Sequence, residues 1–221
     1  MTSEAQTYEV KSQKTRAELT LLDDYTGEPV VGATFAVEGR ENTVTDSNGK
    51  VVLTDLEKGV TYKAKLSGLP EPYHAKETDV SFTVDKDGRI DGNAVSEINM
   101  TAYIIRLSAT ASDMLFGNDI TSTKIRLYDA NDALVEEWEG TGTSHEIEDL
   151  APGTYTLEVG GRKSSRAVVE VKDTGGLQTV STKYWTLWDT IAVIGALVLL
   201  SLIVTLIIKI VHRIGRKRRD E

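Results

Sequence analysis

Three aspartates in the stretch DKDGRIDG have the alternate spacing of a calcium-binding loop. Asp85, Asp87 and Asp91 stand at the first, third and seventh positions of such a loop. The loop also needs an oxygen ligand at its fifth position and a glutamate at its twelfth. Arg89 and Ser96 stand at those two positions. The stretch is therefore better explained as a glycine-containing hairpin turn, and it predicts no metal site.

Other residue types that perform catalysis or bind cofactors are scattered or missing. The three histidines, His74, His145 and His212, are far apart in the sequence. The chain has no cysteine, which excludes disulfides, thiolate metal sites and a cysteine nucleophile. No serine stands in a nucleophile-elbow sequence. We therefore predict no catalytic, no cofactor-binding and no metal-ligating residue, and we expect a protein that is not an enzyme.

Charge is distributed unevenly along the 221 residues. There are 25 lysines and arginines against 34 aspartates and glutamates, a formal net charge of −9. Basic residues are concentrated from Lys209 onward, so the part of the chain before the apolar segment is more acidic than the whole chain. Because binding to nucleic acid needs a basic surface on the folded part, this distribution argues against a nucleic-acid partner.

An apolar segment near the C-terminus predicts a transmembrane helix over residues 188–210. Its centre, TIAVIGALVLLSLIVTLII, has no charged residue, and a helix of 19 residues spans about 28 Å, close to the ~30 Å hydrocarbon core. The aromatic cluster YWTLW precedes it at the level of the headgroups, and a basic tail over 211–221 follows. The positive-inside rule then predicts a cytoplasmic tail and extracellular N-terminal domains. The lipid bilayer is an expected partner through this helix.

The N-terminal segment 1–14 is polar and has no apolar run that would direct secretion. Three explanations are open: a signal peptide is missing from this chain, the start is misassigned, or the chain is tail-anchored with a cytoplasmic body. A tail anchor would carry the basic residues across the membrane, which the positive-inside bias opposes. We therefore expect a missing signal peptide.

Between these ends, short runs of alternating apolar and polar residues predict β-strands. Ala17, Leu19 and Leu21 share one face of the first run. Turn sequences such as DDYTGEP, DSNGK and DKDG separate the runs, which is typical of an antiparallel sandwich with one buried face per sheet.

The second half of the chain repeats this plan. VVLTDLEKGVTY aligns with SHEIEDLAPGTY, so that Asp55 matches Asp149. KIRLYDANDALVEEW predicts a hairpin with Ile125 and Leu127 on the core side and a turn at Asp129–Asp132. We therefore predict an all-β protein with two tandem sandwiches over 15–101 and 102–178, a juxtamembrane stem over 179–187 and then the single transmembrane helix.

The order of these turns resembles a known family. TGEPVVGATF, TDSNGKVVLTDLEKGVTY and SFTVDKDG are similar to the B-type repeats of Cna collagen adhesins and to the SpaA-like pilin domains of Gram-positive surfaces. YDANDALV and DLAPGTYTLEV carry the same pattern in the second repeat. The resemblance covers most of residues 15–171. It implies prealbumin-like (Ig-like), seven-stranded-type sandwiches displayed outside the cell.

Many members of that family form an intramolecular isopeptide bond, in which a lysine of the first strand attacks an asparagine of the last and a glutamate transfers protons. The resemblance places the lysine at Leu21, the glutamate at Leu66 and the asparagine at Met100. Asn99 is one residue away from Met100, the asparagine position, and should face the opposite side of its strand. In the second module Val159 takes the glutamate position, and YIIRLSATA offers no lysine. We therefore expect sandwiches stabilised by apolar burial, without the cross-link.

The segment before the apolar helix also departs from the family. DTGGLQTVSTKYWTLWD contains nothing like the LPxTG sorting motif of wall-attached relatives, so we expect the helix to stay in the membrane. The leading hypothesis is a non-catalytic, membrane-anchored extracellular protein acting in surface display, adhesion or as a stalk. The alternative is an accessory subunit of a membrane transport, secretion or cell-wall complex. A protein partner on the cell surface or in a membrane complex fits both.

A loop at the end of the first sandwich is a candidate contact surface. LPEPY, residues 69–73, combines an aromatic residue with two prolines, and ligand contacts tend to use loops held on a rigid scaffold. A stiff proline-containing connection is the better explanation of this sequence.

Overall fold

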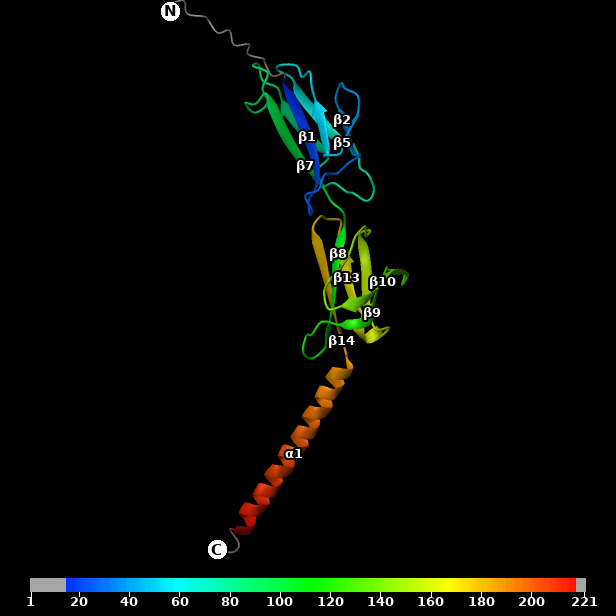
Figure 1. Cartoon of the computed structure of the whole chain (residues 1–221), viewed down its shortest axis with the longest axis vertical. Coiled ribbons are helices and arrows are strands. Elements are labelled where there is room, and N and C mark those ends of the chain that lie inside the picture. The colour runs from blue at the N-terminus through cyan, green and yellow to red at the C-terminus, as the bar shows by residue number, and fades with distance from the viewer. Residues whose placement is uncertain (1–14, 218–221) are drawn as a thin grey trace, which may run out of the picture. The chain divides into compact units, whose positions relative to one another are not determined.

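The computed structural model describes residues 15–217, so the expectations for 1–14 and for the last residues of the basic tail fall outside that range. Apart from a long C-terminal helix and one 3-10 turn, the regular elements of the described chain are β-strands (Figure 1). The chain forms two compact units. The first reaches Arg106 and takes in 148–151 and 173–177, and the second contains 107–147, 152–172 and the chain from Gln178 on.

Seven strands build the first unit, in two sheets. One sheet has the order β4-β1-β7 and the other the order β3-β2-β5-β6. β1 pairs antiparallel with β4 and parallel with β7. The strands are β1 (Arg16–Asp23), β2 (Thr34–Val37), β3 (Thr43–Val44), β4 (Lys50–Leu53), β5 (Thr61–Gly68), β6 (Asp79–Thr83) and β7 (Val95–Ala102).

The second group of seven strands repeats this arrangement. Its sheets have the orders β11-β8-β14 and β10-β9-β12-β13, so each strand takes the place of the strand seven positions earlier. The strands are β8 (Arg106–Asp113), β9 (Thr121–Tyr128), β10 (Leu134–Thr141), β11 (His145–Ile147), β12 (Gly153–Val159), β13 (Ala167–Val171) and β14 (Leu177–Tyr184); the 3-10 turn η1 (Lys163–Ser165) precedes β13. The predicted fold class, two tandem β-sandwiches followed by one helix, is confirmed.

The internal repeat read from the sequence also appears in the backbone. Asp55 and Asp149, which the sequence alignment pairs, both have positive φ, 54° and 59°. Aspartate tolerates this left-handed conformation better than most residues because its short polar side chain can hydrogen-bond locally. The same unusual turn therefore precedes β5 and β12.

Apolar alternation places the cores where the sequence predicts them. Leu19, Leu21 and Phe35 are fully buried between the sheets of the first unit. In the second, Ile125 and Leu127 are buried on β9, which forms the predicted hairpin with β10. Burial of a leucine or phenylalanine side chain contributes about 1.5–3 kcal/mol, so these residues supply the main stabilisation of each sandwich.

The expectation of a juxtamembrane stem over 179–187 is wrong up to Tyr184. These residues belong to β14, which lies beside β8 as the last strand of its sheet. Val180 is the buried apolar residue of β14, and the other inward position is Thr182, whose hydroxyl donates to the Ser165 carbonyl. Because a hydrogen-bonded threonine replaces an apolar side chain, the alternation was too weak to indicate a strand.

The C-terminal helix is longer than predicted. α1 spans Leu187–Lys217, and its part Leu187–Ile214, 28 residues, is long and apolar enough to cross a membrane. The basic segment from 211, expected as a separate tail, continues the helix at least to Lys217. Lysine and arginine are good helix formers and no proline interrupts the segment, so nothing in the sequence ends the helix at residue 210.

Gly49 closes the turn before β4 at a point where two backbones meet. Its φ is +68°, and its carbonyl accepts a hydrogen bond of 2.8 Å from the Leu21 amide. A Cβ atom at this position would lie 2.5 Å from the Leu21 carbonyl oxygen. The residue must therefore be glycine for its conformation and for the close approach of β1.

We predict that Gly49→Ala destabilises the first sandwich more than Gly39→Ala does. Gly39 has a similar φ, +76°, but no atom lies within 4 Å of a Cβ built there. Its substitution should cost only the left-handed strain, about 1–2 kcal/mol, whereas Gly49→Ala must also displace β1. Hydrogen-exchange mass spectrometry of β1 and β7 peptides measures both, and equal losses of protection would contradict the prediction.

Candidate functional site: the cross-link positions and a buried ion pair

The three positions that hold isopeptide reactants in the resembling family converge in the first core. Leu21 on β1, Leu66 on β5 and Met100 on β7 are at most 7% exposed and belong to one apolar cluster. Leu21 lies directly opposite Met100 in the parallel β1–β7 ladder. The fold therefore places these positions as the chemistry would need them, but supplies neither an amine, a carboxyl nor an amide at any of them.

Asn99 cannot substitute for Met100, because it is exposed on the other face of β7. That face does hold a lysine and glutamates. Lys50 Nζ lies 3.2 Å from Glu18 Oε2 and 3.5 Å from Glu97 Oε1. The hydrogen bond to Glu18 raises the pKa of Lys50 and keeps the amine charged, the opposite of what a nucleophile requires.

Lys50 and Asn99 also do not lie on neighbouring strands. Both lie opposite Thr20, one from β4 and the other from β7. Two strand spacings, roughly 9–10 Å, therefore separate their backbones. On the outer face of this sheet Lys50 is engaged in ion pairs with Glu18 and Glu97.

The second sandwich offers no alternative. Val159, at the glutamate position, is fully buried on β12, and β8 contains no lysine. The neighbouring Glu158 faces the opposite side of β12, where Arg166 Nε lies 2.8 Å from its Oε2. This carboxylate is paired with a permanent cation and does not act as a proton shuttle in the core.

A buried ion pair is the strongest electrostatic feature of the first unit. Arg106 Nη2 lies 3.1 Å from Asp23 Oδ2, and both side chains are almost completely buried. Arg106 Nε also donates to Glu148 Oε1 at 2.9 Å, and the guanidinium carbon lies 5.1 Å from the centre of the Tyr25 ring. Sequence reasoning missed this pair, although an arginine within the apolar run YIIRL was a visible signal of a buried partner.

Asp23 also organises the turn that follows β1. Its Oδ1 accepts hydrogen bonds of 2.9 Å from the amides of Tyr25 and Thr26. Burial alone would raise the pKa of Asp23, but these amides and the Arg106 guanidinium outweigh it and hold the pKa below its ordinary value. The carboxylate is thus kept ionised as a structural group.

The other polar candidates from the sequence also have structural partners. Asp85 Oδ1 accepts from the amides of Asp87 and Arg89 within the expected hairpin turn. His74 stacks on Tyr103, with ring centroids 5.7 Å apart, and His145 stacks on Trp138 at 4.4 Å. Within residues 15–217 no group of three metal-ligating side chains is found.

The loop LPEPY is held by its own apolar residues. Leu69 and Tyr73 pack against the first core. This packing favours the interpretation of the loop as a stiff connection over its interpretation as a ligand-binding loop.

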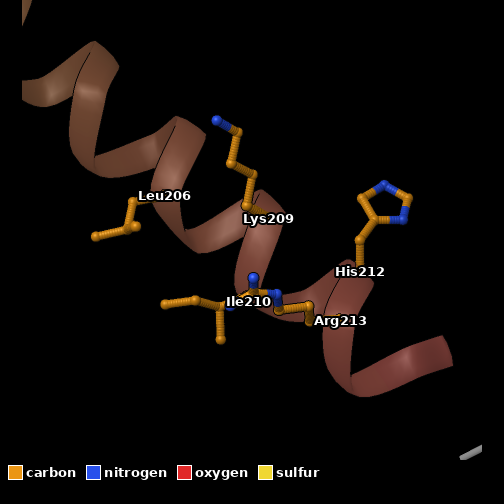
Figure 2. A pocket seen from close by; sticks show the side chains of 5 residues that line it. All are labelled: Leu206, Lys209, Ile210, His212 and Arg213. Carbon is orange, nitrogen blue, oxygen red and sulfur yellow. The ribbon is translucent and has the colours of Figure 1, made fainter. Parts of the chain in front are cut away.

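Figure 2 shows a hollow along α1 lined by side chains of this one helix. Leu206 and Ile210 project to one side, whereas Lys209 and His212 project to another. No residue of another element lines it. The hollow therefore marks the change from apolar to basic residues along α1, and it does not form an enclosed binding site.

We predict that Asp23→Asn destabilises the first unit at neutral pH by about 3–5 kcal/mol, because it leaves a buried arginine without its counter-charge. Since folding lowers the pKa of Asp23, the carboxylate stabilises the fold above its ordinary pKa, and this contribution is lost as the pH falls through the lowered value. The difference between Asp23→Asn and the wild type should therefore shrink in acid. Thermal unfolding at pH 7 and pH 3 measures it.

Asp24→Asn is the matched control for this prediction. Burial and the neighbouring Asp23 charge raise the pKa of Asp24, so its ionised form is disfavoured by the fold. Its neutralisation should be harmless or slightly stabilising at pH 7. Equal destabilisation by both variants would show that the Asp23–Arg106 charge pair is not the cause.

Comparison with known proteins identifies the first sandwich. The family model of the SpaA prealbumin-like fold domain matches residues 15–97. No curated protein matches the chain. Among solved structures, the Bacillus anthracis TIE protein is 19% identical with a TM-score of 0.38, covering 77% of this chain and 34% of its own.

Two pilins give similar values. The Streptococcal ancillary pilin is 13% identical with a TM-score of 0.39, over 79% of this chain and 63% of that one. The shaft pilin SpaA of Lactobacillus rhamnosus GG is 8% identical with a TM-score of 0.36, over 79% and 98%. This chain spans about a third of the TIE protein and less than two-thirds of the ancillary pilin. Residues 15–97 match the SpaA prealbumin-like fold domain, in agreement with the resemblance seen in the sequence.

Proposed function

We propose that this chain is a non-catalytic, membrane-anchored surface protein that displays two prealbumin-like sandwiches outside the cell, as a stalk or in adhesion. The observation that carries the proposal is the direct succession of β14 and α1. Only Trp185 and Thr186 separate the last strand from an apolar helix of membrane-spanning length (Figure 1). A domain fused this closely to a membrane helix stays at the membrane surface.

The position of the last strand also supports the proposal that the helix stays in the membrane. In the resembling family, wall-attached members carry their sorting motif just before the helix. Here that place is occupied by β14, whose residues are paired within a sheet. A sortase would find neither the motif nor an unpaired peptide to cleave.

The apolar cross-link positions support a role without permanent mechanical load. Covalent ties between first and last strands prevent a domain from opening, whereas burial of Leu21, Leu66 and Met100 stabilises it reversibly. A display module or stalk needs a folded domain but not an unbreakable one. This distinguishes the proposed role from that of a pilus shaft.

The buried polar atoms support the non-catalytic part of the proposal. Within the described residues, every buried side-chain nitrogen or oxygen of a residue that is not exposed has a hydrogen-bond partner. Carboxylates such as Asp23 and Asp113 serve their own turns. Such groups are used for the fold.

We predict that the intact mass of the folded protein equals the mass calculated from its sequence. An isopeptide bond would release one ammonia, so a deficit of that mass would contradict the assignment. The triple variant Leu21→Lys, Leu66→Glu, Met100→Asn restores the three reactants at their buried positions and serves as the positive control. Mass spectrometry under denaturing conditions reads both proteins.

We predict that single cysteines place the second sandwich outside the cell and the C-terminal end of α1 on the cytoplasmic side. Because the chain has no cysteine, Asn131→Cys and His212→Cys each introduce one thiol. In intact cells expressing the gene, a membrane-impermeant maleimide should label residue 131 and should label residue 212 only after permeabilisation. The reverse pattern would contradict the orientation, and a stoichiometric membrane partner in mild detergent would favour the accessory-subunit alternative.

A further inference from the structure

The loop between β8 and β9 exposes three consecutive apolar side chains. Met114, Leu115 and Phe116 are 38%, 47% and 62% exposed. An exposed run of large apolar residues is unfavourable in water, and in soluble domains it marks a contact with another molecule or with a membrane.

The loop holds this conformation through its own hydrogen bonds. Asp113 Oδ1 accepts from the amides of Phe116 and Gly117, both at 2.7 Å, and its Oδ2 accepts from Asn118 Nδ2 at 2.7 Å. The Asp113 side chain is buried beneath the loop. The apolar tip is therefore held by a turn that its own hydrogen bonds stabilise.

The first sandwich contains the same turn with a polar tip. Asp23 donates its amide to the Glu28 carbonyl as Asp113 does to Asn118, both at 2.8 Å, and Gly27 and Gly117 have φ values of 73° and 72°. Between these fixed points the first unit has Asp-Tyr-Thr where the second has Met-Leu-Phe. The fold does not require apolar residues at these positions, so they need another explanation in the second unit.

A carboxylate of the C-terminal helix binds the loop. Asp189 Oδ1 accepts from the Leu115 amide at 3.0 Å, and its Oδ2 lies 3.4 Å from the Met114 amide. The same Oδ2 accepts from the amide and hydroxyl of Thr186, which caps the helix in return. The loop is thus fastened to the first turn of α1.

Helix length places this first turn at the membrane boundary. A hydrocarbon core of ~30 Å takes about 20 helical residues. Counted back from Lys209, the first basic residue of the helix, 20 residues lead to Asp189. The loop that binds Asp189 therefore lies at the level of the headgroups, beside Leu187 and Trp188, both 73% exposed.

On the basis of the proposed membrane anchoring, we infer that Met114, Leu115 and Phe116 insert into the interfacial layer of the bilayer as a second membrane contact of this protein. The second sandwich then contacts the membrane through this apolar loop as well as through the helix. Its contact is with acyl chains and not with anionic headgroups, because the loop 113–119 has no basic residue and the flanking Asp119 is acidic. Two contacts fix the tilt of the sandwich on the membrane, which one helix alone leaves free.

Single spin-labelled cysteines in the full chain test this in phosphatidylcholine nanodiscs. Labels replace Phe116 and, independently, Leu115 in the loop. Leu199 in the centre of α1 and Asn131 in the turn after β9 serve as references. β9 has eight residues, so the turn at 131 lies roughly 25 Å from the loop. Circular dichroism verifies that each variant is folded, and collision with a water-soluble nickel complex reports exposure to water.

We expect collision rates at 115 and 116 to be several-fold lower than at 131 and to fall toward the rate at 199. Rates at 115 and 116 equal to that at 131, with 199 protected, would overturn the inference and leave the membrane anchor intact. A water-exposed label at 199 would overturn the anchor and the inference together. Asp189→Ala should raise the rate at 116 and leave 199 unchanged, and an unchanged rate at 116 would refute the role of Asp189.

Discussion

β1 and β7 are the first and last strands of the first sandwich, and they lie side by side in parallel register from Arg16 opposite Val95 to Asp23 opposite Ala102. Every other feature of that unit depends on this ladder and on the apolar side chains behind it. In cross-linked relatives a covalent bond would join the same two strands. Here Leu21 and Met100 meet by dispersion and burial, contributions that are large together but reversible. The lifetime of the closed sandwich is therefore set by its unfolding rate, and no chemical bond has to break.

A carboxylate at the end of the first strand organises the next turn in both sandwiches. Asp23 and Asp113 each collect two backbone amides, so each brings a negative charge into a buried site. The remaining oxygen is matched differently: Arg106 pairs with Asp23, whereas the neutral Asn118 donates to Asp113. The repeat thus conserves the backbone function of the aspartate and varies its partner. Such a buried acid tolerates replacement poorly, because its charge and its hydrogen bonds are lost together.

The parts of the fold that depend on apolar alternation could be predicted from the sequence. The inward faces of β1, β2 and β9, the Asp129 hairpin and the burial of Leu21, Leu66 and Met100 all follow from period-two patterns. β14 could not, because an inward threonine is satisfied by a hydrogen bond that only the folded chain provides. The Asp23–Arg106 pair joins residues 83 positions apart, and no local pattern encodes that distance. The Thr186–Asp189 capping box was readable, since T-x-x-D before an apolar run is a helix-start signal.

Asp189 shows how the second sandwich and the helix depend on each other. A helix start leaves backbone amides without partners, and a carboxylate close to hydrocarbon is costly unless it is hydrogen-bonded. Thr186 donates hydrogen bonds to one oxygen of the Asp189 carboxylate, and the β8–β9 loop donates an amide to the other. That amide is in place only because Asp113 has already shaped the loop. The first turn of the helix is therefore completed by the folded sandwich, and a change in the loop acts on the helix start as well.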